Sequence, residues 1–424
     1  MMKRIFPALV AVALAAVCAR ANACPSTDQV LAPVHVVDVE AGVVRRERAL
    51  VISGGRIVAE SAASVASGAT RTDGRGAYVI PGLWDMHVHA LWDASVPEPF
   101  FRMFLDAGVT SLRDMGGDLK VAVAARAGAD GCSAQPHFWF AGPFLDGPQP
   151  VDPALSIALR TPQDGQAAVR MLKRQGVDFL KVYSLVPGDV FAAILDEAER
   201  AGLPVAGHLP GSVKVSDPNV RRMASIEHLA IELGGLCTFD DPAACGPVFD
   251  ALINAGVAMT PTLIARETST RMADKDFRPT YEGLPPAVRS YWESSLNLTA
   301  GRDDAWRAQR KVSLAHARRM TRELARRNAV LLGGSDAGTP FVVPGASLHD
   351  ELALMVEAGL SPLEALRAAT VAPARFMKRA DMGRIAPGAV ADLVLLSGNP
   401  LDDIRNTRRI VGVYVNGRPV TGHR

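Results

Sequence analysis

The sequence lacks the features that define several common protein classes. Its formal net charge is only +2 over 424 residues, and it contains no dense run of Lys and Arg interleaved with aromatic residues. A phosphate-binding surface needs clustered positive charge, so we expect no nucleic-acid partner. The five cysteines contain no Cys-x-x-Cys motif, which excludes a zinc ribbon. Beyond the N-terminus no apolar run is long enough to span a bilayer, so we expect no stable membrane insertion.

The N-terminus carries the pattern of an export signal. A basic start, Met1 to Arg4, precedes an apolar run from Ile5 to Val17, and Ala21-Asn22-Ala23 is a small-x-small cleavage site. We therefore expect residues 1–23 to be removed and the mature protein to be periplasmic or extracellular. Two alternatives are an uncleaved membrane anchor and a lipoprotein acylated at Cys24, although the residues before Cys24 lack the Leu of a lipobox.

Signal cleavage leaves an even number of cysteines for an oxidising compartment. They are Cys24, Cys132, Cys237 and Cys245, which allow three disulfide connectivities. Cys237 and Cys245 bracket a short loop rich in Asp and Pro, so we expect these two to be joined.

The two ends of the mature chain have a different pattern from its middle. Residues 24–79 and 381–424 alternate β-branched runs with Gly-rich turns, which predicts a small β-sandwich domain built from both chain ends. Residues 80–380 alternate short apolar runs with longer amphipathic stretches, which predicts an α/β fold with a parallel sheet. The stretch 279–328 is polar and Arg-rich, and we expect it to be helical and to cover the site as a lid.

Eight strand candidates occur in this middle region. They are Leu83–His89, Val109–Asp114, His137–Ala141, Phe179–Tyr183, Val205–Leu209, Ser225–Leu229, Ala258–Leu263 and Val330–Ser335. Eight such units favour a (β/α)8 TIM-like barrel, in which the chemistry lies at the carboxyl ends of the strands.

Polar residues end five of these otherwise apolar strands. His87 and His89 lie two apart on the first strand, so both imidazoles can face one point. The others are Lys181, His208, His228 and Asp336, at the ends of the fourth, fifth, sixth and eighth strands. A buried Lys or Asp is costly without a partner, so convergence on metal is more economical than several separate buried polar groups.

Together with two C-terminal motifs, this set resembles the amidohydrolase superfamily. The motifs are Gly383-x-Ile385-x-Pro387-Gly388-x-x-Ala391-Asp392-Leu393 and Gly398-Asn399-Pro400-Leu401. Within the superfamily the chain is most similar to the imidazolonepropionase-like branch, which includes Xaa-Pro dipeptidases. The resemblance implies two divalent metal ions. It implies that His87, His89 and Asp336 hold one ion, that His208 and His228 hold the other, and that Lys181 bridges both as N6-carboxylysine.

The chemistry of such a centre requires these residue types. A Lys ammonium has only donors, whereas its carbamate is an oxygen anion that can bridge two cations. Two metals lower the pKa of a shared water and polarise a carbonyl, and Asp336 can act as the general base. Zinc suits the ligand set best, while manganese, cobalt and iron remain open. The alternative for Lys181 is a lysine that caps a helix or extends its ammonium to solvent.

Other residues are candidates for supporting roles. Tyr183 lies two residues after Lys181 on the same strand face and is a candidate to form a hydrogen bond with the substrate carbonyl. Arg113, Arg266 and His349 fall in loops after strands two, seven and eight, where they could bind a substrate carboxylate, and a solvated surface role is the alternative for each. Asp85 and Glu227 adjoin ligand histidines, and a structural salt bridge is as good an explanation for each.

The leading functional hypothesis is hydrolysis of an amide or peptide bond in a small substrate, such as a dipeptide or an N-acyl amino acid. One alternative is hydrolysis of a cyclic amide, lactone or ester by the same centre, and another is a non-catalytic binding protein. Lys181 argues against the deaminase-like branch with one metal, whose members typically lack the bridging residue. The sequence leaves a homo-oligomer open.

Overall fold

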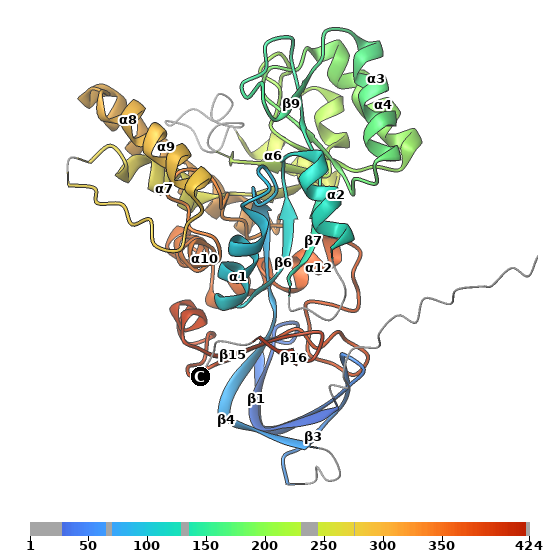
Figure 1. Ribbon diagram of the computed structural model, residues 1–424, viewed down its shortest axis with the longest axis vertical. Helices are drawn as coiled ribbons and strands as arrows, with labels where there is room; N and C mark the ends of the chain where they lie inside the picture. The colour runs from blue at the N-terminus through green and yellow to red at the C-terminus, as the bar shows by residue number, and fades with distance from the viewer. Residues whose placement is uncertain (1–27, 65–69, 129–134, 230–244, 275, 421–424) are drawn as a thin grey trace, which may run out of the picture.

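The computed structural model describes residues 28–64, 70–128, 135–229, 245–274 and 276–420 (Figure 1). The expected signal peptide, together with Cys24, Cys132 and Cys237, lies outside the described residues. Across the described ranges, none of the helices combines the length and the apolar character needed to cross a bilayer.

Both ends of the chain contribute strands to one sheet, which lies below the rest of the molecule in Figure 1. Its order is β16-β15-β14-β4-β1-β2-β3. The strands are β1 (Gln29–Asp38), β2 (Val43–Ser53), β3 (Arg56–Ala62), β4 (Thr70–Pro81), β14 (Leu393–Leu396), β15 (Ile410–Val415) and β16 (Arg418–Pro419). Side chains of β1 point alternately to the two faces of this sheet. On one face, Leu31 belongs to an apolar core that also contains Leu50, Val79 and Leu393. The two-layered sandwich stays a prediction.

The middle of the chain forms parallel sheets, as the alternating pattern predicts. One sheet has the order β13-β12-β11-β10-β8-β9 and the other β5-β6-β7, and the strand pairs in both are parallel. Their bounds are β5 (Leu83–Val88), β6 (Val109–Asp114), β7 (His137–Phe140), β8 (Phe144–Asp146), β9 (Ser156–Ala158), β10 (Leu180–Val182), β11 (Val205–Gly207), β12 (Ser225–Glu227) and β13 (Ala258–Thr260). Seven of the eight expected strands are present, and β8 and β9 are additional.

Hydrogen bonds join these two sheets on both sides. The expected eighth strand makes isolated parallel bridges, Met259 with Leu331 and Val88 with Ala337, so the segment 331–337 connects β13 to β5. On the other side, the Asp178 N–H donates to the Phe140 carbonyl at 3.0 Å, which links β7 to the start of β10. This ring of bonds is the connection that a (β/α)8 barrel requires.

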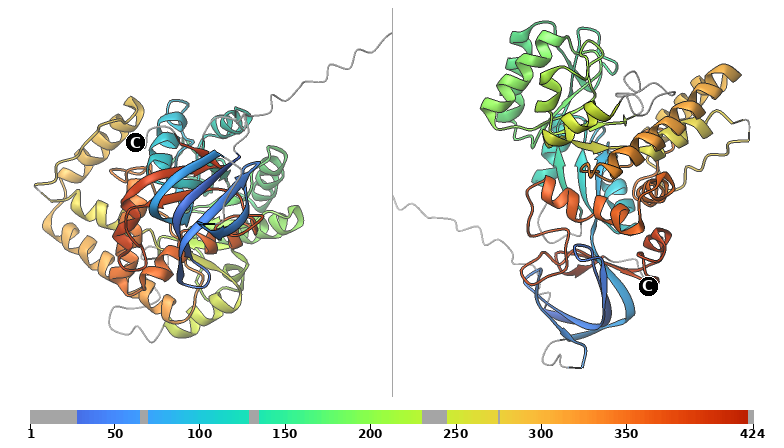
Figure 2. Two further views of the ribbon diagram at one scale, coloured as in Figure 1. Left: turned by 90° about the horizontal axis from the view of Figure 1, so that it is seen from below. Right: turned by 180° about the vertical axis from the view of Figure 1, so that it is seen from behind.

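Helices follow the strands on the outside of the parallel sheets (Figure 2). They are α1 (Pro97–Asp106), α2 (Leu119–Ala127), α3 (Pro162–Arg174), α4 (Gly188–Ala201), α6 (Gly246–Asn254), α7 (Leu263–Arg271), α10 (Ala346–Ala358), α11 (Pro362–Ala368) and α12 (Val371–Phe376), with 3₁₀ turns η1 (Pro218–Arg222) and η3 (Ile404–Arg408). Capping is local: the Thr161 side chain accepts from the Asp164 N–H at the start of α3.

The Arg-rich stretch before the eighth strand is helical, as expected. It forms α8 (Pro286–Ala300) and α9 (Asp304–Arg326), which extend to one side in Figures 1 and 2. An aromatic cluster attaches α8 to the loop that follows Asp336. The Trp292 indole N–H donates to the Gly338 carbonyl at 3.3 Å, and its ring lies 5.1 Å from that of Phe341.

Candidate metal centre

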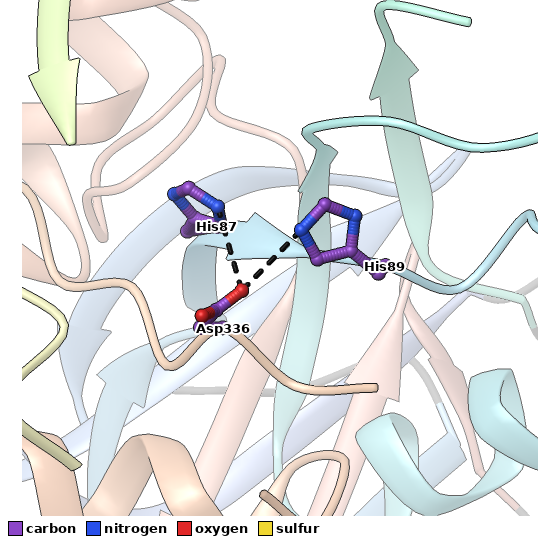
Figure 3. Close-up of side chains that lie close together, drawn as sticks. All are labelled: His87, His89 and Asp336. Carbon is purple, nitrogen blue, oxygen red and sulfur yellow. Dashed lines mark ion pairs between the residues drawn. The ribbon is translucent and has the colours of Figure 1, made fainter. Parts of the chain in front are cut away.

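Three side chains from the first and eighth strand positions meet at one point (Figure 3). One ligand atom from each of His87, His89 and Asp336 lies within 4.8 Å of the other two. Asp336 Oδ1 is 3.5 Å from His87 Nε2 and 3.3 Å from His89 Nε2. Both His87 Nε2 and Asp336 Oδ1 are buried and have no hydrogen-bond partner within the described ranges. Buried acceptors facing one another are costly unless a cation lies between them, so the group fits a divalent metal.

The remaining predicted ligands lie around the same space. Lys181 on β10, His208 after β11 and His228 after β12 line a cavity of about 350 Å³, together with His89 and Asp336. The His228 ring centroid is 4.5 Å from that of His87 and 5.0 Å from that of His208. The structure therefore brings together all six residues that the sequence analysis selects as ligands.

The backbone at the site is strained where it presents these side chains. His228, Thr262 and Asp336 have φ angles of +53°, +49° and +66°, values that cost energy for any residue other than glycine. Gly207 allows its backbone to pack closely against β10. A Cβ atom at this position would lie 2.2 Å from the Val182 carbonyl oxygen and 3.0 Å from the Lys181 Cδ. Such strain at adjacent positions is typical of functional sites.

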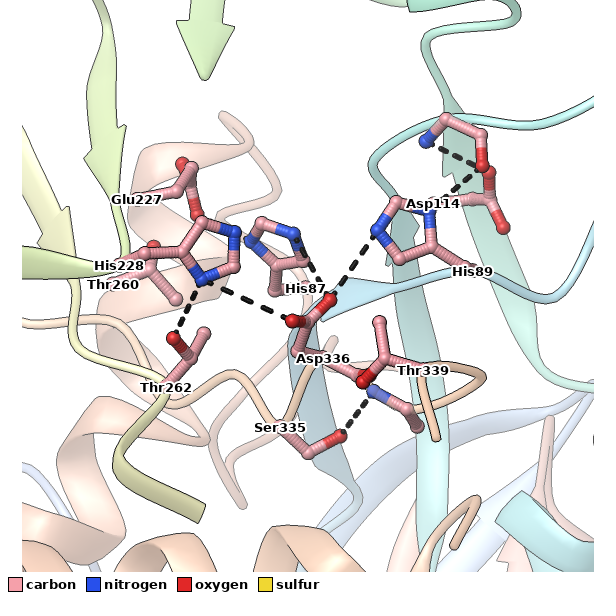
Figure 4. A network of polar contacts seen from close by, with 12 residues as sticks. His87, His89, Asp114, Glu227, His228, Thr260, Thr262, Ser335, Asp336 and Thr339 are labelled. Atoms are coloured by element: carbon pink, nitrogen blue, oxygen red, sulfur yellow. Dashed lines mark hydrogen bonds and ion pairs between the residues drawn. The ribbon is translucent and has the colours of Figure 1, made fainter. Parts of the chain in front are cut away.

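Each imidazole is oriented through its Nδ1 atom, as Figure 4 shows for His228 and Thr262. The partners, all 2.7 or 2.8 Å away, are Glu227 Oε2 for His87, the Gly116 carbonyl for His89, Ser184 Oγ for His208 and Thr262 Oγ1 for His228. Hydrogen bonds of this kind fix the ring and its tautomer in metal sites. Sequence reasoning missed Gly116, Ser184 and Thr262, because their pairing depends on strands that are distant in sequence.

The protonation of the histidines suits metal binding. Burial, with a smaller contribution from the positive charge of Lys181, holds the pKa of His87 and His208 well below the usual value. Burial followed by proximity to His87 does the same to the pKa of His228. For His89 burial opposes the charged form, but contact with Asp336 outweighs it and raises the pKa. Three of the four imidazoles are thus neutral, the form that binds metals.

Arg113 is not at the substrate cavity, which corrects the sequence-based assignment. It lies within β6, is 1 % exposed, and donates to Glu227 Oε1 at 2.8 Å, Ser225 Oγ at 2.9 Å and the Met86 carbonyl at 2.7 Å. The physical reason is the fully buried carboxylate of Glu227, which needs a cation beside it. Glu227 in turn contacts His87, so Arg113 supports a ligand rather than the substrate.

His349 is also a correction. Sequence reasoning places it in a loop that meets the substrate, but it lies in α10 and is 3 % exposed. Its Nδ1 lies 2.9 Å from Thr407 Oγ1 and its Nε2 lies 3.0 Å from the Ala107 carbonyl oxygen. Both ring nitrogens have partners in the protein, so His349 ties α10 to its neighbours.

The other two substrate candidates do line the cavity. Tyr183 stacks on His208 with ring centroids 4.1 Å apart, and Arg266 lies on the wall formed by α7.

Asp85 has a structural role, but with a hydroxyl partner instead of a salt bridge. It accepts from the Ser335 N–H at 2.9 Å and from the Ser335 hydroxyl at 2.5 Å, which holds the residue before Asp336. Burial raises the pKa of Asp85 to about 7.

Of the two cysteines expected to form a disulfide, only Cys245 lies among the described residues. Cys245 is disulfide-bonded and lies directly before α6. Cys237 lies outside the described residues, so its pairing with Cys245 stays a prediction.

Comparison with known proteins supports this geometry. The sequence profile of the amidohydrolase family matches residues 78–420. The structure of a putative prolidase from Bifidobacterium longum superposes with a TM-score of 0.74 at 27% identity, covering 94% of this chain and 96% of that chain. The bottromycin amidohydrolase AH gives a TM-score of 0.72 at 30% identity, covering 93% and 87%.

A curated relative is more distant. The adenine deaminase of Ligilactobacillus salivarius (strain UCC118) is 22% identical over 325 residues, which is 76% of this chain and 46% of the relative. The chain thus spans about half the length of that deaminase. The profile match covers most of the chain and the likeness to the bottromycin enzyme extends over both proteins, so the resemblance inferred from the strand-end ligands is confirmed: the chain belongs to the amidohydrolase family.

Proposed function

We propose that the protein is an exported hydrolase that cleaves the amide or peptide bond of a dipeptide or an N-acyl amino acid, using two divalent metal ions. The observation that carries this proposal is the convergence of His87, His89, Lys181, His208, His228 and Asp336 on one cavity. The likeness to a putative prolidase supports the substrate class. We further propose that the hydrogen-bonded ring is a closed (β/α)8 barrel.

The group of His87, His89 and Asp336 supports the first ion, and the rest of the assignment is proposed from the family resemblance. His87, His89 and Asp336 would hold one ion, and His208 and His228 the other, with Lys181 bridging them as its carbamate. Zinc is the proposed metal, since neutral imidazoles with oxygen anions are its usual ligands. When bound, the metals would lower the pKa of a water and polarise the scissile carbonyl.

The side chains of the cavity supply the proton transfers and the orientation. Asp336 would accept the proton of the attacking water at its carboxylate and pass it to the nitrogen of the leaving amine. Burial raises the pKa of Tyr183 above its ordinary range, so this hydroxyl keeps its proton and can donate a hydrogen bond to the scissile carbonyl. The α8–α9 insertion lines the same cavity and would limit the entry of water.

Export is proposed from the N-terminal pattern of residues 1–23. The disulfide at Cys245 supports it, because structural disulfides persist in oxidising compartments and are rare in the cytosol.

Two measurements on the mature protein test the proposed function. Elemental analysis should find about two divalent ions per chain, and the zinc-loaded protein should hydrolyse members of a library of dipeptides and N-acyl amino acids. His87→Ala should lose metal and turnover together. His35→Ala, which removes an imidazole from β1 of the terminal sheet and outside the cavity, is the control and should retain both. A fully loaded, active preparation with one ion would refute the two-metal centre, and turnover confined to cyclic amides, lactones or esters would refute the substrate class.

A further inference from the structure

One wall of the cavity is built by the insertion that forms α8 and α9. Five of its side chains line the cavity: Ser295 and Thr299 on α8, and Trp306, Arg310 and Ala317 on α9. Residues four apart on a helix share a face, so each helix presents one face to the cavity. The volume of about 350 Å³ lies near the lower end of the roughly 300–1,000 Å³ range of small-molecule sites.

The charges of this wall are positive. Among the described residues that line the cavity, the only carboxylate is Asp336, in the ligand cluster, whereas α7 contributes Arg266 and α9 contributes Arg310. A substrate that fills the cavity therefore meets cationic side chains outside the ligand cluster. Such a wall favours an anionic group on the substrate.

Arg310 is the better placed of the two arginines to take that group. Its guanidinium carbon lies 4.7 Å from the ring centroid of Trp306, whose other neighbour, Arg302, is 5.8 Å away. Arg310 is half-buried, and in the part of the chain that the structure describes it makes no ion pair with a carboxylate. Burial lowers its pKa, and Arg302 adds to that effect. A bound anion would offset both costs.

The insertion holds Arg310 at a set position relative to the ligands. Arg307, on the same helix, donates to the Ala273 carbonyl at 2.8 Å and so attaches α9 to the end of α7. Trp292 of α8 donates to the carbonyl of Gly338, two residues after Asp336. These two contacts attach the insertion, and with it Arg310, to the elements that carry the site.

We propose that Arg310, held against the ring of Trp306, binds the free α-carboxylate of the substrate's C-terminal residue. This rests on the proposed amide hydrolysis and narrows it to short substrates with a free C-terminus. A guanidinium binds a carboxylate through two parallel hydrogen bonds, which a neutral carboxamide cannot reproduce. C-terminally amidated substrates are then bound less tightly because they lack the charge that the guanidinium pairs with.

Binding of an uncleavable ligand tests the proposal independently of turnover. The ligand is an Ala-Leu isostere in which CH2–CH2 replaces the scissile amide, prepared as the free acid and as the carboxamide, and titrated calorimetrically into the metal-loaded protein. We expect the wild type to bind the acid roughly 10- to 100-fold more tightly than the carboxamide. Arg310→Met should remove this preference. Arg310→Lys keeps the charge and the aliphatic stem, and its preference for the acid should be several-fold smaller than that of the wild type.

Lys311→Met is the matched control. It removes the same charge from the adjacent position of α9, but Lys311 is exposed and does not line the cavity, so the preference should stay at the wild-type level. Melting curves should show that the Arg310→Lys variant is folded.

The outcomes separate this proposal from the reaction on which it rests. Equal binding of acid and carboxamide by the wild type, or an unchanged preference in both Arg310 variants, would overturn the carboxylate subsite. If the wild type cleaves no dipeptide but shows an acid preference that depends on Arg310, the proposed reaction is wrong and the subsite is retained.

Discussion

The substitution Arg113→Met distinguishes two roles for this residue: a buried ion pair with Glu227, which the structure shows, and a contact with substrate, which the sequence suggests. Arg113 is 1 % exposed and Glu227 is fully buried, and their contacts are 2.8 and 3.0 Å. Removing one partner of a buried pair leaves an uncompensated charge, which costs about 3–5 kcal/mol. That is a large part of the roughly 5–15 kcal/mol by which a protein domain is typically stable.

The metal content should fall as well. Glu227 orients His87 through a 2.8 Å contact with Nδ1, and loss of such a partner typically weakens metal binding about 10- to 100-fold. Urea unfolding followed by circular dichroism measures the loss of stability, and elemental analysis after dialysis measures the loss of metal. The control is Arg102→Met, whose pair with Asp106 is about half-exposed and should contribute less than about 1 kcal/mol.

A double variant isolates the pair. Arg113→Met with Glu227→Gln removes both charges, so most of the lost unfolding free energy should return while the metal deficit persists. If Arg113→Met instead has wild-type stability and metal content but a raised KM, Arg113 contacts substrate and our interpretation of the buried network is refuted.

Three further predictions concern other parts of the molecule. Lys181→Ala should remain folded and lose turnover, and short carboxylic acids, but not primary amines, should restore part of it; rescue by amines alone would refute the carbamate bridge. Burial raises the pKa of Glu351 to about 8 from an ordinary 4.5, so the stability from its neutral form, complete below about pH 4.5, is lost as pH rises through about 8. Glu351 alone should therefore lower the free energy of unfolding by about 3 kcal/mol between about pH 6 and pH 9, and Glu351→Gln, unlike Glu357→Gln on the same helix, should reduce the fall by that amount; an unchanged slope would contradict it. Mass spectrometry of unreduced peptides should find Cys237 joined to Cys245, and a free Cys237 would disprove the pairing.

The sequence was most informative where one strand carries its own signal. Val109–Asp114 is a short segment with β-branched residues at its start and glycines on either side, and it is found with the expected bounds as β6. The ligands were identifiable for the same reason, because a polar residue at the end of an apolar strand is unusual in itself. The short strand β9 was missed because Ser156–Ala158 follows a stretch rich in Pro and Asp that is typical of loops.

What the sequence could not show is pairing between distant segments. Arg113 and His349 both have a residue type suited to binding a carboxylate, and nothing near them in sequence indicates that they are buried. The partner of Arg113 is Glu227, on a strand in the other parallel sheet, and the partners of His349 are Thr407 and Ala107. Only the assembled fold distinguishes such structural residues from Arg266, which lines the cavity.

The terminal sheet affects the order in which a newly synthesised chain can fold. β4 runs directly toward β5 and His87, yet its edge pairs with β14, where Ile80 lies opposite Val394. The segment 331–337, which links β13 to β5, also leaves the ribosome late. The strand that carries His87 and leads into His89 therefore stays incompletely paired through most of translation, a situation in which unpaired strand edges favour aggregation. We expect chains that end before residue 393 to be retained by chaperones or degraded, even though every ligand residue has already been made.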